Sequence, residues 1–200
     1  KEDIKILKKT KKVDFLYIPK FKDIYNKNKK SNIKIEKKDK ILCAKFRKGH
    51  FEGVLDVMGR LTNLVNPKKI FMGKKDYQQY FLIKNYLKNK YKTSIIPCKT
   101  IRNKSKMALS SRNNHLDLNG IKKASFLSKS LIKLKRNLAN SKKIKQNLKI
   151  QMKYFEKFLK IKIEYLELRS IKNLKISNTV RGSRLFIAYY INNVRLIDNF

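Results

Sequence analysis

Three polar segments carry the residue types and spacings best suited to chemistry: FRKGHFEGV at 46–54, GKKDYQQ at 73–79 and SKMALSSRN at 105–113. A glycine after a strand lets backbone N–H groups approach a ligand closely, and a helix start adds free donors and a positive dipole end. The Ser-Ser-Arg run adds two hydroxyls and a fork of N–H donors, which match phosphate oxygens. The segments therefore favour anion binding.

The segment at 73–79 offers the most specific chemistry. Lys75 could supply a full charge for a phosphate, and Asp76 could accept hydrogen bonds from ribose hydroxyls. Gln79 lies about one helical turn beyond Asp76 and would face the same side. Taken singly, each segment also fits a structural role: an ordinary turn, a capped loop, or a helix cap at Arg47 and His50. The sequence has neither a Walker A loop nor a G-x-G-x-x-G fingerprint, so these alternatives stay open.

Alternating helix and strand patterns must position the first two segments. Apolar residues at steps of three and four predict helices over residues 2–9, 50–65 and 76–90. Short apolar or alternating runs predict strands over 13–18, 33–36, 69–72 and 93–96, the last one stopped by Pro97, and residues 21–32 are predicted to form a loop. Strands and helices in alternation predict βαβ units and a parallel sheet, with ligands bound at the carboxyl ends of its strands.

The second half of the chain has a different pattern. Two long apolar stripes predict helices over 121–140 and 141–160, and three apolar runs predict strands over 161–168, 184–191 and 194–198. This order indicates an α+β domain. We expect the boundary between Pro97 and Asn103, which divides the chain into residues 1–99 and 100–200.

Composition narrows the function classes. The chain has 52 Lys and Arg against 14 Asp and Glu, a net charge of +38, which by itself favours a polyanionic partner. The lysines are spread over every segment, however, and nucleic-acid binders usually cluster their charge, so a biased composition is the preferred interpretation. Cys43 and Cys98 give no disulfide framework, and neither His50 nor His115 belongs to a metal-ligand cluster. No apolar run reaches 18 residues and no signal peptide is visible, so no membrane association is expected.

The order and spacing of the three segments resemble the pantothenate synthetase (pantoate–β-alanine ligase) family. RKGHFEGV at 47–54 is similar to that family's Arg-Pro-Gly-His-Phe-x-Gly-Val, FMGKKDYQQ at 71–79 to its Phe-Gly-Glu-Lys-Asp-x-Gln-Gln, and LSSRN at 109–113 to its Met/Leu-Ser-Ser-Arg-Asn. YLELR at 165–169 and RLIDN at 195–199 also resemble the family's C-terminal domain. The resemblance covers nearly the whole chain.

This resemblance implies an ATP-dependent ligase that forms a C–N bond in pantothenate and coenzyme A biosynthesis. Pantoate and ATP would give pantoyl adenylate and pyrophosphate, and β-alanine would then release AMP and pantothenate. The implied fold is α/β: a partial Rossmann-like nucleotidyltransferase sheet of the HIGH superfamily, followed by a small α+β C-terminal domain. The resemblance also implies Mg²⁺ with ATP, no metal ligands from the protein, a cytoplasmic location, a homodimer when complete, and no nucleic-acid partner.

Site residues are implied motif by motif. Arg47 and Gln79 would bind pantoate, and Lys75, Ser110, Ser111 and Arg112 would carry the catalytic roles. The residues implied to contact ATP are Gly73, Lys74, Lys75, Asp76, Ile101, Leu109, Ser110, Ser111 and Arg112. Asp76 would hold the ribose, Ile101 would line the adenine pocket, and the 109–112 loop would hold the phosphates. These roles require Lys75 and Arg112 to share one cleft.

Several positions depart from the family pattern. Lys48 replaces a proline, Cys43 replaces a glutamate in a Leu-Glu-Gly run, and Ser105-Lys106 replaces an Asp-Gly. The family's N-terminal His-x-Gly-His motif is not found, and the chain begins at Lys1 rather than Met, so we expect the 200 residues alone to be inactive. The alternatives are a basic RNA-binding protein, another nucleotidyl-transferring enzyme of the same superfamily, and an inactive remnant of the ligase.

Overall fold

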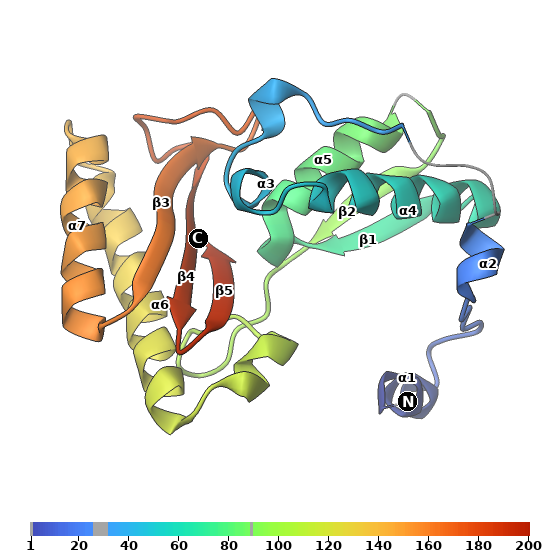
Figure 1. Ribbon diagram of the computed structural model, residues 1–200, viewed down its shortest axis with the longest axis horizontal. Coiled ribbons are helices and arrows are strands. Elements are labelled where there is room, and N and C mark those ends of the chain that lie inside the picture. The colour runs from blue at the N-terminus through green and yellow to red at the C-terminus, as the bar shows by residue number, and fades with distance from the viewer. Residues whose placement is uncertain (1, 26–31, 89) are drawn as a thin grey trace. The chain divides into compact units, whose positions relative to one another are not determined.

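The computed structural model describes residues 2–25, 32–88 and 90–200, in two compact units, Lys1–Asn32 and Ile33–Phe200 (Figure 1). The first unit contains helix α1 (Glu2–Thr10), as expected, and the short helix α2 (Phe21–Ile24). That short helix corrects the prediction of a continuous loop over 21–32, of which residues 26–31 lie outside the described residues. Lys20 initiates α2, where its backbone N–H donates to the Asp23 carboxylate over 2.7 Å.

The strand predicted over residues 13–18 is wrong. No described residue pairs with this stretch, and its apolar side chains are exposed, Phe15 at 94% and Ile18 at 62%. A short apolar run fits a buried strand only where a neighbouring strand satisfies its backbone groups. The strand predicted over 33–36 is also wrong, because this segment has no strand conformation and leads into a 3₁₀ helix (Lys37–Asp39).

The α/β part of the second unit follows the predicted order. It contains α3 (Cys43–Phe46), α4 (His50–Val65), β1 (Lys69–Gly73), a 3₁₀ turn η2 (Lys74–Asp76), α5 (Tyr77–Lys88) and β2 (Ser94–Cys98). Strands β1 and β2 pair in parallel, which confirms the βαβ interpretation. Helix α4 ends at Asn66, whose backbone is left-handed (φ 47°). Pro97 does not stop β2 as predicted, because it pairs opposite Met72. A proline is tolerated in a strand that, among the described residues, has a neighbour on only one side.

The α+β part comprises α6 (Leu118–Leu138), α7 (Ile144–Leu159) and an antiparallel sheet of β3 (Lys162–Ser170), β4 (Ser183–Ile191) and β5 (Val194–Asn199), with β4 in the centre. All five elements were predicted, with small changes in their bounds. The N-terminus of α6 is capped by the Asp117 carboxylate, which accepts a hydrogen bond from the Gly120 N–H over 2.6 Å.

Both faces of the antiparallel sheet are buried. Leu185 and Ile187 of β4 pack with α6 and α7, whereas Phe186 and Ala188 pack with the core of the α/β part. Alternate residues of a strand point to opposite faces, so one strand serves both cores. Figure 1 shows the two helices on one side of this sheet and the α/β part on the other. The sheet therefore holds the two parts against each other and fixes the loops between them.

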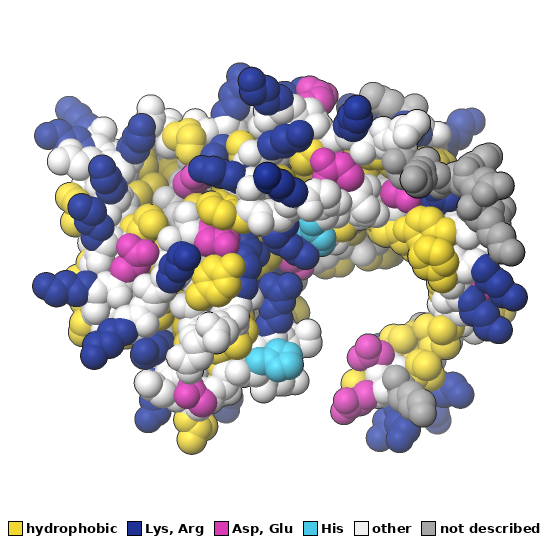
Figure 2. All heavy atoms as spheres, viewed as in Figure 1, with side chains coloured by type: hydrophobic (Ala, Val, Ile, Leu, Met, Phe, Trp, Pro, Cys, Tyr) yellow, Lys and Arg dark blue, Asp and Glu magenta, His cyan; other side chains and the backbone are white. Residues whose placement is uncertain are grey.

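Positive charge is widely spread. Figure 2 shows Lys and Arg side chains dispersed over the visible face, with Asp and Glu between them, rather than gathered into one stripe. Among the helices of the described residues, none is long and apolar enough to cross a membrane.

Candidate active site

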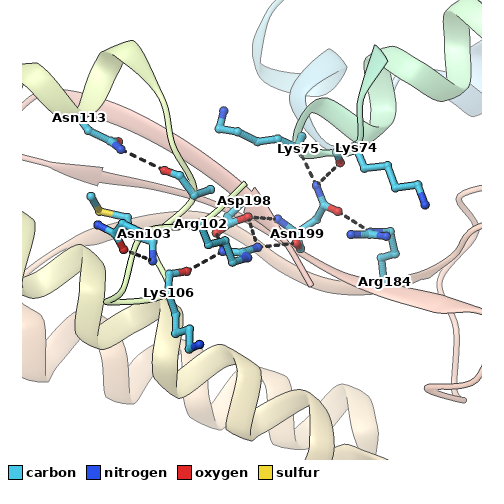
Figure 3. A network of polar contacts seen from close by, with 11 residues as sticks. Lys74, Lys75, Arg102, Asn103, Lys106, Asn113, Arg184, Asp198 and Asn199 are labelled. Carbon is cyan, nitrogen blue, oxygen red and sulfur yellow. Dashed lines mark hydrogen bonds and ion pairs between the residues drawn. The ribbon is translucent and has the colours of Figure 1, made fainter. Parts of the chain in front are cut away.

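The turn after β1 brings Lys75 and Asp76 to the carboxyl end of the parallel sheet. The 3₁₀ conformation of Lys74–Asp76 is held from across the molecule by Asn199, whose side-chain amide donates to the carbonyls of Lys74 (3.0 Å) and Lys75 (2.7 Å) (Figure 3). Asn199 is almost completely buried, and its Oδ1 accepts a hydrogen bond from Arg184. The last strand of the chain therefore positions the turn.

The loop with the twin serines is shaped by its own side chains. A bridge between Arg102 and Ala108 closes a small hairpin, and the Ser110 hydroxyl accepts from the Arg112 N–H (3.3 Å) at the start of a 3₁₀ helix (Ser111–His115). The Arg112 guanidinium donates to the carbonyl of Arg195 over 3.0 Å. These contacts present Ser110, Ser111 and Arg112 together.

The turn and the loop meet at one cavity of about 220 Å³. Lys75 and Arg112 both line it, as the family resemblance required. The other lining residues include Arg47, Asp76, Ser110, Ser111, Asn113, Tyr189 and Asp198. Lys75 Nζ lies 3.9 Å from Asp76 Oδ1, so a cation and an acceptor stand side by side at the opening. The cavity combines donors for phosphate oxygens with acceptors for hydroxyls.

The electrostatics of the cavity favour a bound anion. Burial lowers the pKa of Arg47, and the neighbouring charges of Arg112 and Arg195 lower it further. Burial and the same group of cations lower the pKa of His50, so this imidazole is neutral at pH 7. Both shifts have one physical cause beyond burial, an excess of positive charge that a negatively charged ligand would offset.

A smaller adjoining cavity contains Gln79, Arg47, His50 and Cys43. The Cys43 sulfur lies 3.1 Å from the Tyr165 hydroxyl and 3.5 Å from a nitrogen of Arg195. Arg195 donates two hydrogen bonds to Glu164 (2.6 and 3.0 Å). Burial raises the pKa of Tyr165, so its hydroxyl stays protonated and can donate. Gln78, next to Gln79, also lines this cavity, and its side-chain amide donates to the Ile41 carbonyl over 2.8 Å.

Five residues of the predicted site lie apart from the 220 Å³ cavity: Gln79, which lines the adjoining cavity, and Gly73, Lys74, Ile101 and Leu109. Lys74 lines a different cavity, and Figure 3 shows Lys74 and Lys75 extending away from each other on either side of Asn199. Ile101 and Leu109 are exposed at 65% and 54% and are joined by a hydrogen bond from Leu109 N–H to the Ile101 carbonyl (2.9 Å). Gly73 is the exposed last residue of β1.

The positioning residues were not predicted. Arg102 forms a two-pronged ion pair with Asp198 (2.7 and 2.8 Å), and its Nη2 also donates to the Asn199 carbonyl over 3.1 Å. The RLIDN segment at 195–199 contributes to the family resemblance, but the sequence predicts no positioning role for its residues. Three polar residues in five positions near the end of a strand are the signal that could have revealed them.

Comparison with known proteins identifies the family. The family model described as pantoate-beta-alanine ligase matches residues 1–200. Pantothenate synthetase of Leptospira interrogans is 37% identical over 205 residues, covering 98% of this chain and 70% of the relative. The enzyme of Caldicellulosiruptor saccharolyticus is 34% identical over 196 residues, covering 94% of this chain and 68% of the relative.

Solved structures similar to this chain belong to the same family. The crystal structure of pantothenate synthetase from Thermus thermophilus superposes with a TM-score of 0.89 at 26% identity, covering 100% of this chain and 73% of that protein. The pantoate-beta-alanine ligase from Francisella tularensis, complexed with beta-gamma ATP and beta-alanine, gives 0.79 at 34% identity, covering 100% and 68%. The match to the family model and these likenesses in sequence and fold show that the chain belongs to the pantoate-beta-alanine ligase family.

Proposed function

We propose that this protein condenses pantoate with β-alanine in a reaction driven by ATP, through a pantoyl-adenylate intermediate. The observation that carries the proposal is the meeting of Lys75, Arg112 and Arg47 at one cavity. Family membership supports the overall reaction, a C–N ligation, and the described residues supply the chemical groups that each step needs.

In the first step, a carboxylate oxygen of pantoate attacks the α-phosphorus of ATP, and the bond to pyrophosphate breaks. Lys75 and the Ser110–Arg112 loop hold the phosphates and stabilise the charge on the leaving pyrophosphate. Asp76 accepts hydrogen bonds from the ribose. The exposed side chains of Ile101 and Leu109 offer apolar surface for the adenine ring, and the Gly73–Lys74 backbone lies beside the nucleotide.

In the second step, the amine of β-alanine attacks the acyl carbon of the adenylate. The amide bond forms, AMP leaves with the former carboxylate oxygen, and the amine loses a proton to solvent. Arg47 and Gln79, which line the adjoining cavity, hold pantoate through both steps. Because both reactants are held in place and no covalent enzyme intermediate forms, catalysis rests on positioning and charge stabilisation.

Mg²⁺ and dimerisation complete the proposal. Mg²⁺ binds mainly to substrate phosphates and water, so it would arrive with ATP and would need no ligand from the protein. Among the described residues no group of three His, Cys, Asp or Glu could hold a metal, so no separate metal site is proposed. We also propose a homodimer, a cytoplasmic location and a functional division near residue 100, between the sheet that binds substrates and the domain that supplies the phosphate loop.

Exchange of labelled pyrophosphate into ATP tests the first step. Exchange should require pantoate, and Lys75→Ala should lower its rate roughly 100-fold or more, because a charge that acts on the phosphates is lost. Lys69→Ala removes an exposed lysine from β1 and should leave the rate unchanged. Exchange without pantoate would contradict a pantoyl-adenylate intermediate, and equal rates in the two variants would remove Lys75 from this role.

The competing RNA-binding function makes the opposite prediction. A basic RNA-binding protein would bind nonspecific RNA with strong salt dependence and would not respond to pantoate. The dispersed charge in Figure 2 favours the ligase, because nucleic-acid binders gather their charge on one face.

A further inference from the structure

A second cavity, of about 610 Å³, lies on the opposite side of Asn199 from Lys75. It is formed by the segment after β2, one side of α6, the start of β4 and the end of β5. Six cationic side chains line it, and its described lining contains no Asp or Glu: Lys74, Lys99, Arg102, Lys135, Arg136 and Arg184. We refer to it as the cationic cavity.

The excess of charge distinguishes this cavity. Four other cavities formed by the described residues each include at least one carboxylate in their lining, although the same lysine-rich chain forms all of them. The composition of the chain therefore does not by itself account for a lining without acidic residues. Of the six cations only Arg102 has a carboxylate partner, Asp198, among the described residues.

Two of the remaining cations, Lys135 and Arg184, are held in place by contacts that involve no Asp or Glu. Lys135 donates to the carbonyl of Phe200 over 2.9 Å, and Arg184 lies over the ring of Tyr77 (5.2 Å) while donating to Asn199. Burial lowers the pKa of Lys135, and the charge of Arg184 lowers it further. These contacts orient Lys135 and Arg184, and six cations without an Asp or Glu in the described lining leave a positive potential in the cavity.

An unsatisfied hydroxyl also lines the cavity. The Thr100 Oγ1 is buried and has no hydrogen-bond partner among the described residues. Buried hydroxyls nearly always have a partner, and a missing one indicates a ligand or water. A hydroxyl beside several cations is the set of donors that phosphoryl oxygens match.

We propose that the cationic cavity is a second anion site, which takes a small polyanion with two or more phosphoryl groups. It is separate from the 220 Å³ cavity that we propose for ATP, which we call the nucleotide cavity. Its volume is within the usual range for small-molecule sites, roughly 300–1,000 Å³. The described lining contains no Asp or Glu to accept hydrogen bonds from a ribose, which favours a compact phosphate such as inorganic pyrophosphate over a nucleoside. The proposal does not depend on the ligase function.

Calorimetric titration with inorganic pyrophosphate at constant ionic strength tests it. The unaltered protein should bind two pyrophosphates, one in each cavity. Lys135→Ala with Arg136→Ala should weaken one site at least tenfold and leave the other, whereas Arg112→Ala should do the reverse. Lys129→Ala with Lys133→Ala removes the same number of charges from exposed positions of α6 outside the cavity and should retain both sites. A single site that Arg112→Ala abolishes would overturn the proposal.

A footprint on the unaltered protein decides the question even if a variant fails to fold. Pyrophosphate should slow acetylation of Lys99 and Lys135 at least threefold, with Lys129 and Lys133 unaffected. Equal protection of all four lysines would reject the site. Protection by a single-stranded oligonucleotide at lower concentration than pyrophosphate would also reject it, in favour of a nucleic-acid backbone.

Discussion

The two cavities beside Asn199 differ in charge although they share a wall. The nucleotide cavity, about 220 Å³, mixes Lys75, Arg112 and Arg47 with the carboxylates of Asp76 and Asp198. The cationic cavity, about 610 Å³, has no Asp or Glu in its described lining. A nucleotide needs acceptors for its ribose as well as donors for its phosphates, whereas a simple polyanion needs donors only. Net charge alone therefore does not distinguish the two cavities, and acidic residues among the cations are the feature that we expect of a nucleotide site.

The Arg102–Asp198 ion pair lies between the two cavities, and we refer to this pair as the wall. Arg102 lines the cationic cavity, Asp198 lines the nucleotide cavity, and the two are joined by hydrogen bonds of 2.7 and 2.8 Å. Their side chains are 19% and 6% exposed, so neither charge is fully hydrated. If this pair separates the cavities, breaking it should have the largest effect on the folded protein.

Asp198→Ala should lower the free energy of unfolding by roughly 3 kcal/mol, because it leaves the Arg102 charge largely buried without a partner. Urea denaturation measures the change. Glu36→Ala breaks an exposed ion pair with Lys38 and should cost less than about 1 kcal/mol. Adding Arg102→Leu to Asp198→Ala should recover part of the loss. Equal costs for Asp198→Ala and Glu36→Ala would show that the pair does not hold the wall.

Asn199→Asp tests whether Asn199 positions the turn that carries Lys75 in the nucleotide cavity. Aspartate can still accept from Arg184, but it cannot donate to the carbonyls of Lys74 and Lys75, so the turn that carries Lys75 should loosen. A lost donor to buried carbonyls is worth about 1–3 kcal/mol, and we expect the KM for ATP to rise roughly tenfold with a smaller change in kcat. Steady-state kinetics measure this split. A fall in kcat at unchanged KM would contradict a positioning role on the nucleotide side.

Much of this fold could be predicted from the sequence. Periodic apolar residues predicted α4, α6 and α7 because each helix buries one face against a sheet or another helix. The strands predicted at 13–18 and 33–36 failed because an apolar run says nothing about whether a pairing partner exists. Pro97 failed as a stop signal because the effect of a proline depends on whether its backbone N–H would face a neighbouring strand.

The site was predictable where chemistry was concentrated in one segment. Lys75, the twin serines and Arg112 carry phosphate-binding groups in short motifs, and the structure brings them to one cavity. Lys74 has the same side chain as Lys75, and only the geometry of the 3₁₀ turn sends the two in different directions. The Arg102–Asp198 pair joins positions 96 residues apart, and spacing along a chain does not reveal such contacts.

The titration of His50 gives a way to assign a ligand to one cavity. Burial and the charges of Arg47, Arg112 and Arg195 lower the pKa of this imidazole, so pyrophosphate in the nucleotide cavity should raise it. Proton NMR titration measures the change, with His50→Asn to assign the resonance. Lys135→Ala with Arg136→Ala should retain the rise, since that variant alters only the cationic cavity. No rise in the unaltered protein would place the ligand away from His50.

The lowered pKa of His50 also determines how the free energy of unfolding changes with pH. Because the pKa of His50 is lower in the folded state, the unfolded chain takes up the proton first as the pH falls below about 6.5. The contribution of His50 to stability is therefore complete above that pH and is lost as the pH falls through the folded-state pKa. His50→Asn should flatten this part of the pH profile of the free energy of unfolding.

The smallest effect is expected at Lys106, whose carbonyl accepts a hydrogen bond from Arg102 over 2.9 Å and so supports the wall. Lys106 has a left-handed backbone (φ 68°), a conformation that favours glycine. Lys106→Gly should relieve about 1–2 kcal/mol of backbone strain, and the greater freedom of glycine in the unfolded chain should offset about half of it. We expect a net gain of roughly 0.5–1 kcal/mol, seen as a rise in Tm of a few degrees. Lys104→Gly, in the same loop but outside the left-handed region, should give no gain. Equal changes in the two variants would mean that the turn at Lys106 carries no strain, and that the wall depends on the ion pair alone.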